Sequence, residues 1–170
     1  MSYCKHMKTF LAGSLLLFMA LSSLSAGTFQ FPDDNPVVSV TIPATWKPSE
    51  DETGVEATSK DEEVYIDIQS TNTKTVEKGI DDALAYLKDK GVTVTADSVK
   101  KQELKLNGLN VFEIAWDGTD EDGACKISLS VISVTDNQGL LVIYWASPEG
   151  EKKNQAALNQ IANSITPLAK

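Results

Sequence analysis

Apolar residues recur along this chain with two different periods, and each period predicts a different kind of element. Alternation of apolar and polar residues in segments 37–42, 63–70, 92–96, 104–106, 109–116 and 124–134 indicates strands with one buried face. Residues 76–87 and 158–165 instead carry apolar side chains at helical spacing. The segment 140–146 (LLVIYWA) is apolar on both faces, which is typical of a central strand covered on both sides.

Turn-forming and capping residues mark the ends of these elements. The dipeptide at 107–108 (Asn-Gly) predicts a tight hairpin turn, because both residues tolerate positive φ. Thr75 is the expected N-cap of the first helix, and Gly91 supplies its left-handed C-terminal residue. Residues 147–149 (Ser-Pro-Glu) open the second helix, although Gly150 weakens its first turn.

The order of these elements predicts one α+β domain over residues 37–170. We expect an antiparallel sheet of about six or seven strands, flanked by helices on both faces. Segments 54–58 and 63–70 are expected to form a hairpin within it. Residues 27–36 (GTFQFPDDNP) are interpreted as a short lead-in segment.

Residues 1–26 have the organisation of a signal peptide. Lys5 and Lys8 precede an apolar run at 10–21, and small residues close it at 22–27. We expect cleavage after Ala26, with the two neighbouring bonds as alternatives, and Met7 is an alternative start of translation. A retained membrane anchor would need about 20 apolar residues, and this run is shorter. The domain is therefore expected to be exported, to the periplasm or the extracellular space.

Removing residues 1–26 takes away two Lys and no acid, and changes the net charge from −9 to −11. Every remaining basic residue is Lys, so bidentate Arg recognition of phosphate is missing. An acidic domain is repelled by phosphate backbones and anionic lipids. We expect no nucleic-acid partner and no stable membrane insertion after cleavage.

The same cleavage removes His6 and Cys4, and leaves Cys125 as the single thiol with no imidazole. A nucleophile activated by His is then impossible, and so are zinc or haem sites that need His or several Cys. No intramolecular disulfide can form. We expect no catalytic residues, no enzymatic activity and no cofactor. Alternation with Ile127 and Leu129 predicts that Cys125 is a buried hydrophobic residue.

Two further features are candidate sites. The loop 117–123 (DGTDEDG) makes Asp117, Asp120 and Asp122 candidate calcium ligands, although the spacing departs from an EF-hand loop. An ordinary hairpin connection explains the same residues. Trp46, which follows a strand-ending proline, is the candidate for an exposed, partner-binding aromatic residue, whereas Trp116 and Trp145 follow strand alternation and are expected in the core.

The sequence resembles the PsbP/Mog-type α/β fold, including the exported bacterial DcrB-like proteins. Residues 40–46 (VTIPATW), 141–145 (LVIYW) and 160–165 (QIANSI) carry this resemblance. It implies non-enzymatic roles in partner binding or assembly, and no shared catalytic residues. The sequence therefore favours an exported binding or assembly module whose partner is another envelope or extracellular protein. The alternative is a small-molecule or calcium carrier with a pocket between sheet and helix.

Overall fold

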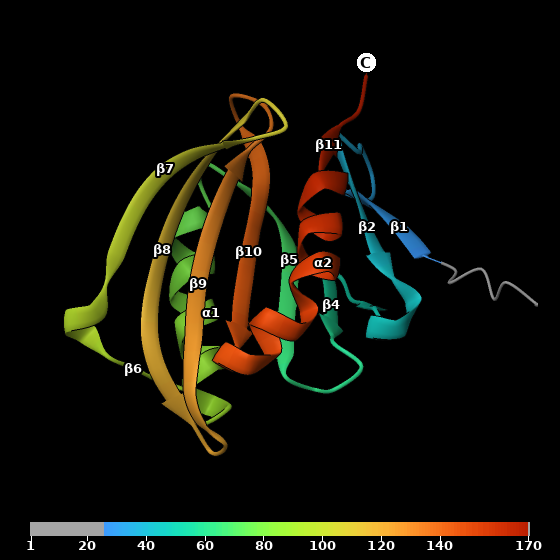
Figure 1. Ribbon diagram of the computed structural model, residues 1–170. Helices are drawn as coiled ribbons and strands as arrows, with labels where there is room; N and C mark the ends of the chain where they lie inside the picture. Colours follow the sequence, from blue (N-terminus) through green and yellow to red (C-terminus); the bar gives the residue numbers. More distant parts are fainter. Residues whose placement is uncertain (1–25, 170) are drawn as a thin grey trace, which may run out of the picture.

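In the computed structural model, residues 26–169 are described, and they place two helices on opposite faces of a bent antiparallel sheet (Figure 1). The predicted α+β class and the helices on both faces are confirmed. The helices are α1 (Val76–Asp89) and α2 (Pro148–Ser164). The sheet is ordered β3 (Ser49–Glu50), β4 (Gly54–Thr58), β5 (Val64–Asn72), β10 (Gln138–Ala146), β9 (Gly123–Ser133), β8 (Leu109–Asp120) and β6 (Thr93–Val94), and β7 (Lys100–Leu106) also pairs with β8.

A second, small sheet lies beside α2 and was not predicted. It is ordered β1 (Ala26–Phe31), β2 (Val38–Pro43) and β11 (Thr166–Pro167). The segment interpreted as a lead-in therefore contains a strand, because Phe29 and Phe31 alternate with polar residues and pair with β2. A 3-10 helix (Ala44–Trp46) follows β2. The interpretation of residues 1–26 as a signal peptide stays a prediction, because all of this segment except Ala26, the first residue of β1, lies outside the described residues.

The two faces of the main sheet carry two separate cores. On one face, α1 buries Ala83 and Leu87 against the side chains of Cys125, Ile127 and Ile143. On the other face, Ile161 of α2 and the apolar residues of β2 pack against β4, β5 and β10. Strand β10 contributes to both cores, which explains why its sequence is apolar on both faces.

The predicted hairpin turn is confirmed, and two other expectations need correction. Asn107 and Gly108 have φ values of 51° and 85° and join β7 to β8. The segment 92–96 forms only the two-residue strand β6, because Thr95 leads into a 3-10 turn (Ala96–Ser98). Thr75 occupies the N-cap position of α1, but its side chain makes no capping bond to the helix.

Gly150 does not weaken the start of α2; it permits the helix to approach β5. The helix begins at Pro148, and the Ser147 hydroxyl accepts a hydrogen bond from the Gly150 N–H at 2.9 Å. A Cβ atom on Gly150 would lie against the Glu63 side chain and 2.8 Å from the Glu63 carbonyl oxygen. Only glycine fits this contact without displacing the helix.

We expect Gly150→Ala to lower the free energy of unfolding by about 1–3 kcal/mol, because the new methyl group overpacks a backbone contact. Urea denaturation measures this change. Gly79→Ala in α1 is the matched control, since its Cβ would meet only the flexible Leu141 side chain, 3.1 Å away, and alanine favours helix. Equal stability of the two variants would contradict the tight approach of α2 to β5.

Candidate functional site

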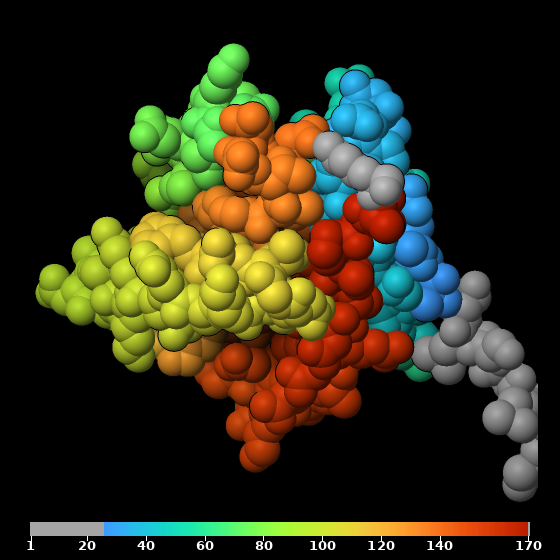
Figure 2. Space-filling model, turned by 90° about the horizontal axis from the view of Figure 1, so that it is seen from above, coloured from blue at the N-terminus to red at the C-terminus, as the bar shows by residue number. Residues whose placement is uncertain are grey.

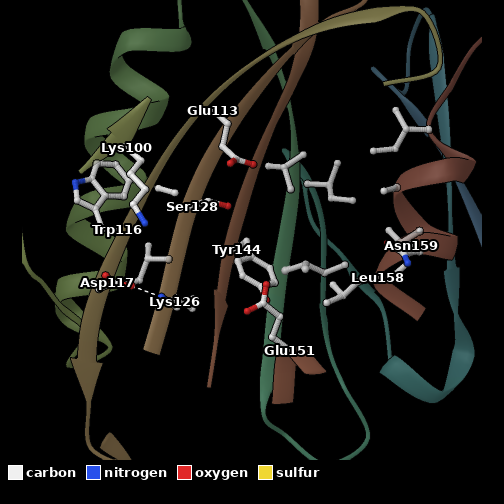
Figure 3. A pocket seen from close by; sticks show the side chains of 18 of the residues that line it. Lys100, Glu113, Trp116, Asp117, Lys126, Ser128, Tyr144, Glu151, Leu158 and Asn159 are labelled. Atoms are coloured by element: carbon white, nitrogen blue, oxygen red, sulfur yellow. Dashed lines mark hydrogen bonds and ion pairs between the residues drawn. The ribbon is translucent and has the colours of Figure 1, made fainter. Parts of the chain in front are cut away.

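A cleft with a volume of about 460 Å³ opens between α2 and the part of the sheet that α2 does not cover (Figure 3). Its size lies within the range of small-molecule sites. Strands β5, β7, β8, β9 and β10 form the floor and far wall, and α2 forms the near wall. The lining includes the side chains of Ile66, Ile68, Lys100, Glu113, Ala115, Asp117, Lys126, Ser128, Val142, Tyr144, Glu151, Leu158 and Ile161.

The strand register explains why a cleft forms here. One row of residues crosses the sheet in the order Ile66, Tyr144, Ser128, Ala115 and Lys100. The side chains of this row are large under α2, small in the middle of the sheet and charged at its edge. Side chains on one face of neighbouring strands lie side by side, so two small residues in succession leave an unfilled depression.

The charged groups on the far side of the cleft are mostly held by partners. Gln102 donates a hydrogen bond from Nε2 to Glu113 Oε1 at 2.7 Å, and the Ser130 hydroxyl donates to Glu113 Oε2 at 3.3 Å. Lys126 forms an ion pair with Asp117. This pair lowers the pKa of the Asp117 carboxyl and raises the pKa of the Lys126 ammonium, through their hydrogen bond first.

The Tyr144 hydroxyl, in contrast, is buried and has no hydrogen-bond partner among residues 26–169. Burial, and then the nearby Glu151 carboxylate, raise the pKa of Tyr144, so the phenol stays neutral. Figure 3 shows the Glu151 side chain next to the Tyr144 ring at the foot of α2. A buried polar atom without a partner is costly, and a partner supplied from the cleft would remove that cost.

The β7–β8 hairpin lies against the C-terminal end of α2 (Figure 2). The Asn107 side chain donates hydrogen bonds from Nδ2 to the Asn163 carbonyl oxygen at 3.0 Å and to the Ile165 carbonyl oxygen at 2.8 Å. These carbonyls end a helix and lack partners within it. The turn residue therefore joins the edge of the sheet to the helix across one end of the cleft.

The structure does not bring the predicted calcium ligands together. Asp117 pairs with Lys126, whereas Asp120 accepts a hydrogen bond from Trp145 Nε1 at 2.7 Å and also binds the Asp122 N–H at 2.9 Å. Strand β8 ends at Asp120 and β9 begins at Gly123. A tight hairpin turn at residues 121–122 therefore joins the two strands. Within residues 26–169, no three His, Cys, Asp or Glu side chains lie close enough to hold a metal ion.

The expectation of an exposed Trp46 is wrong. Its side chain is only 2% exposed, because the 3-10 helix after β2 turns the indole into the core on the α2 side. Trp116 and Trp145 pack against the core on the α1 side, as predicted. Among residues 26–169, Phe112 of β8 is an exposed aromatic residue instead, at 39%, although its strand is paired with β7 on one side and β9 on the other.

The prediction for Cys125 is confirmed. Its thiol is 2% exposed and packs with the α1-side core. Burial first, and then the Asp120 charge, raise the pKa of the thiol to about 11. A thiol with this pKa is almost entirely protonated at neutral pH, so Cys125 is a poor nucleophile.

No protein-family model matches the sequence, and no curated protein matches it. Solved structures are similar in fold. Cyanobacterial PsbP (CyanoP) from Synechocystis sp. PCC 6803 has a TM-score of 0.57 and 7% identity, over 88% of this chain and 96% of CyanoP. LpqN, involved in cell envelope biogenesis of Mycobacterium tuberculosis, has a TM-score of 0.50 and 12% identity, over 85% of this chain and 92% of LpqN.

A protein from Bacteroides thetaiotaomicron VPI-5482 is also similar, with a TM-score of 0.55 and 14% identity over 84% of this chain. This chain spans about half of that protein, 48% of its length. Similarities at such identities concern the fold alone. They confirm that the α+β domain has a PsbP-type fold, as the resemblance implied.

Asp67 is a further group in an unusual environment, on the sheet face opposite the cleft. Burial raises the pKa of its carboxyl to about 6, and Asp51 and Glu56 add to the shift, whereas a hydrogen bond from Gln69 at 2.7 Å opposes it. The folded state therefore binds more protons than the unfolded state between about pH 4 and pH 6. Stability from this group falls as the pH rises through that interval.

We expect Asp67→Asn to raise the free energy of unfolding at pH 7 by about 1–2 kcal/mol, because the amide needs no charge in the buried position. The variant should also lose part of the decline between pH 4 and pH 6. Urea denaturation at several pH values measures both effects. Asp81→Asn, on the exposed side of α1, is the matched control and should change neither. A wild-type stability that does not fall over this interval would contradict the assignment.

Proposed function

We propose that this protein is an exported, non-enzymatic binding module, and that the cleft beside α2 is its ligand-binding site. The observation that carries the proposal is a cleft with an apolar floor and a buried hydroxyl group that lacks a partner. Sites for small molecules combine these features: apolar lining for affinity and a few polar groups for orientation. The sequence analysis left two hypotheses, a binding or assembly module for a protein partner and a carrier of a small molecule or calcium. The geometry of the cleft favours the carrier of a small molecule over a calcium carrier.

Three observations support a function without catalysis. Residues 26–169 contain no His, so the cleft has no imidazole base. Cys125 is buried in the other core and has a raised pKa. Asp117 and Lys126, the closest pair of charged groups in the cleft, neutralise each other. The cleft therefore offers binding groups rather than an activated nucleophile.

The export of the chain is proposed from the pattern of residues 1–26, and a DcrB-like envelope protein is the corresponding assignment. The fold similarity to LpqN, a protein involved in cell envelope biogenesis, supports this proposal. Neither helix of the described residues is long and apolar enough to cross a bilayer. The ligand would then be met in the periplasm or outside the cell, where an envelope protein partner could receive it.

Filling the cleft should abolish binding of an apolar probe. We expect the neutral fluorophore N-phenyl-1-naphthylamine to bind the folded protein, and Ser128→Leu to weaken this binding at least about tenfold, because the new side chain occupies the floor. Ala115→Leu should act in the same way. Fluorescence titration measures the affinity, and thermal melting establishes that each variant is folded.

Ser133→Leu is the matched control: the same substitution, in the same strand, at an exposed position outside the cleft. It should leave the affinity of the probe unchanged. If Ser128→Leu and Ala115→Leu fold and bind the probe as the wild type does, the cleft is not the binding site.

Export can be tested separately. Expressed in a bacterium with two membranes, the full chain should appear in the periplasmic extract with an intact mass that lacks residues 1–26. Leu16→Lys, which interrupts the apolar run, should retain the uncleaved chain in the cytoplasm. Ser2→Lys adds the same charge outside the run and should still be exported. Recovery of the uncleaved wild-type chain in the membrane fraction would contradict cleavage.

A further inference from the structure

We propose that the ligand of the cleft is a small cationic amphiphile, whose apolar body lies on the floor and whose amine head binds between Tyr144 and Glu151. This inference rests on the proposed binding function and specifies the ligand class. It follows from the distribution of apolar surface, hydrogen-bonding atoms and charge within one cavity.

The apolar half of the cleft lies under α2. The partly exposed apolar residues of this half are Val142 of β10 and Leu158 of α2, and they lie against the buried Ile66, Ile68 and Ile161 of the core. An apolar chain or ring placed here would be removed from water on two sides, and each buried methylene group contributes about 0.8 kcal/mol. This half of the cleft selects an apolar body but not its head group.

The polar atoms next to this floor belong to Tyr144 and Glu151. An ionised carboxylate only accepts hydrogen bonds, and a phenol oxygen both donates and accepts. An ammonium group has three donors and no acceptor, so a single ammonium can donate to the Tyr144 oxygen and to Glu151 together. It would supply the partner that the buried Tyr144 hydroxyl lacks and a counter-charge for Glu151.

An anionic head would meet the wrong charges at this place. Glu151 lies beside the Tyr144 ring, and Lys126 is already paired with Asp117. Lys100, the other cation of the cleft, lies three strands away from Tyr144 in the cross-sheet row, about 14 Å at the usual strand spacing. A carboxylate bound at Tyr144 would therefore face the like charge of Glu151, and it would have to compete with Asp117 and Glu151 for the Lys126 ammonium.

The test compares three probes with the same chain and different heads: decylamine, decanol and decanoate, each below its aggregation concentration. Each displaces N-phenyl-1-naphthylamine from the wild-type protein. We expect decylamine to displace it at concentrations at least about tenfold lower than decanoate, with decanol between them, as one charge-assisted hydrogen bond implies.

Two substitutions locate the amine. Glu151→Gln should reduce the preference for decylamine over decanoate by about tenfold, and Tyr144→Phe should also reduce this preference, because it keeps the ring and removes the oxygen that the ammonium binds. Glu149→Gln is the matched control: it removes the same charge two residues away in the first turn of α2, at an exposed position that does not line the cleft. It should leave the preference unchanged, which separates a bound amine from general attraction to an acidic protein.

The outcomes distinguish the two proposals. Probe binding that Ser128→Leu abolishes, with no preference for the amine or a preference for decanoate, overturns the cationic ligand and leaves the binding site standing. An amine preference that Glu149→Gln and Glu151→Gln reduce equally also overturns it. Probe binding that does not respond to cleft substitutions overturns the binding site itself.

Discussion

The position of α2 over one half of the sheet is the constraint on which the rest of the structure depends. The helix is held at its N-terminal end, where Ser147 bonds the Glu63 carboxylate and Gly150 contacts the Glu63 backbone. It is held again at its C-terminal end, where the Ser164 hydroxyl accepts a hydrogen bond from the Thr41 N–H at 2.8 Å. Because both ends are attached, the helix lies over β5, reaches only part of β9, and leaves β7 and much of β8 uncovered on that face.

The cleft follows from this partial cover. A helix about 10 Å wide cannot shield a sheet of this breadth, and the small β1–β2–β11 sheet shields the side away from the cleft. On that face the uncovered strands carry polar or small side chains, such as Lys126, Ser128 and Ser130 in β9. Tyr144 lies at the boundary between the apolar and the polar half of the cleft. An amphiphilic molecule bound there would place its apolar part on the one half and its polar part on the other.

Much of the main sheet could be predicted from local patterns in the sequence. Alternation in β9 and the turn at 107–108 depend on neighbouring residues, and both are found where they were expected. The strand β1 was missed although its partner β2 follows it closely in the sequence, because two phenylalanines among polar residues give a weak alternation signal. Gly150 was misjudged because helix propensity does not include the approach of Glu63, which is distant in the sequence.

The candidate site was predicted only as a location between sheet and helix. Its residues were missed because the row from Ile66 to Lys100 exists only once five strands are in register. The available signal was the run of Lys126, Ser128 and Ser130 on one face of a strand that is apolar on the other. Trp46 was misplaced because its burial depends on how the chain turns after Pro43, which strand alternation does not determine.

The contact between Asn107 and the end of α2 also has a chemical consequence. Asn107 precedes Gly108, and asparagine before glycine is prone to lose its side-chain amide by hydrolysis. The product is a carboxylate, which cannot donate to the Asn163 and Ile165 carbonyl oxygens and carries negative charge to the negative end of a helix. Slow deamidation would therefore replace an attraction between hairpin and helix by a repulsion, and an aged protein would differ from a fresh one at one end of the cleft.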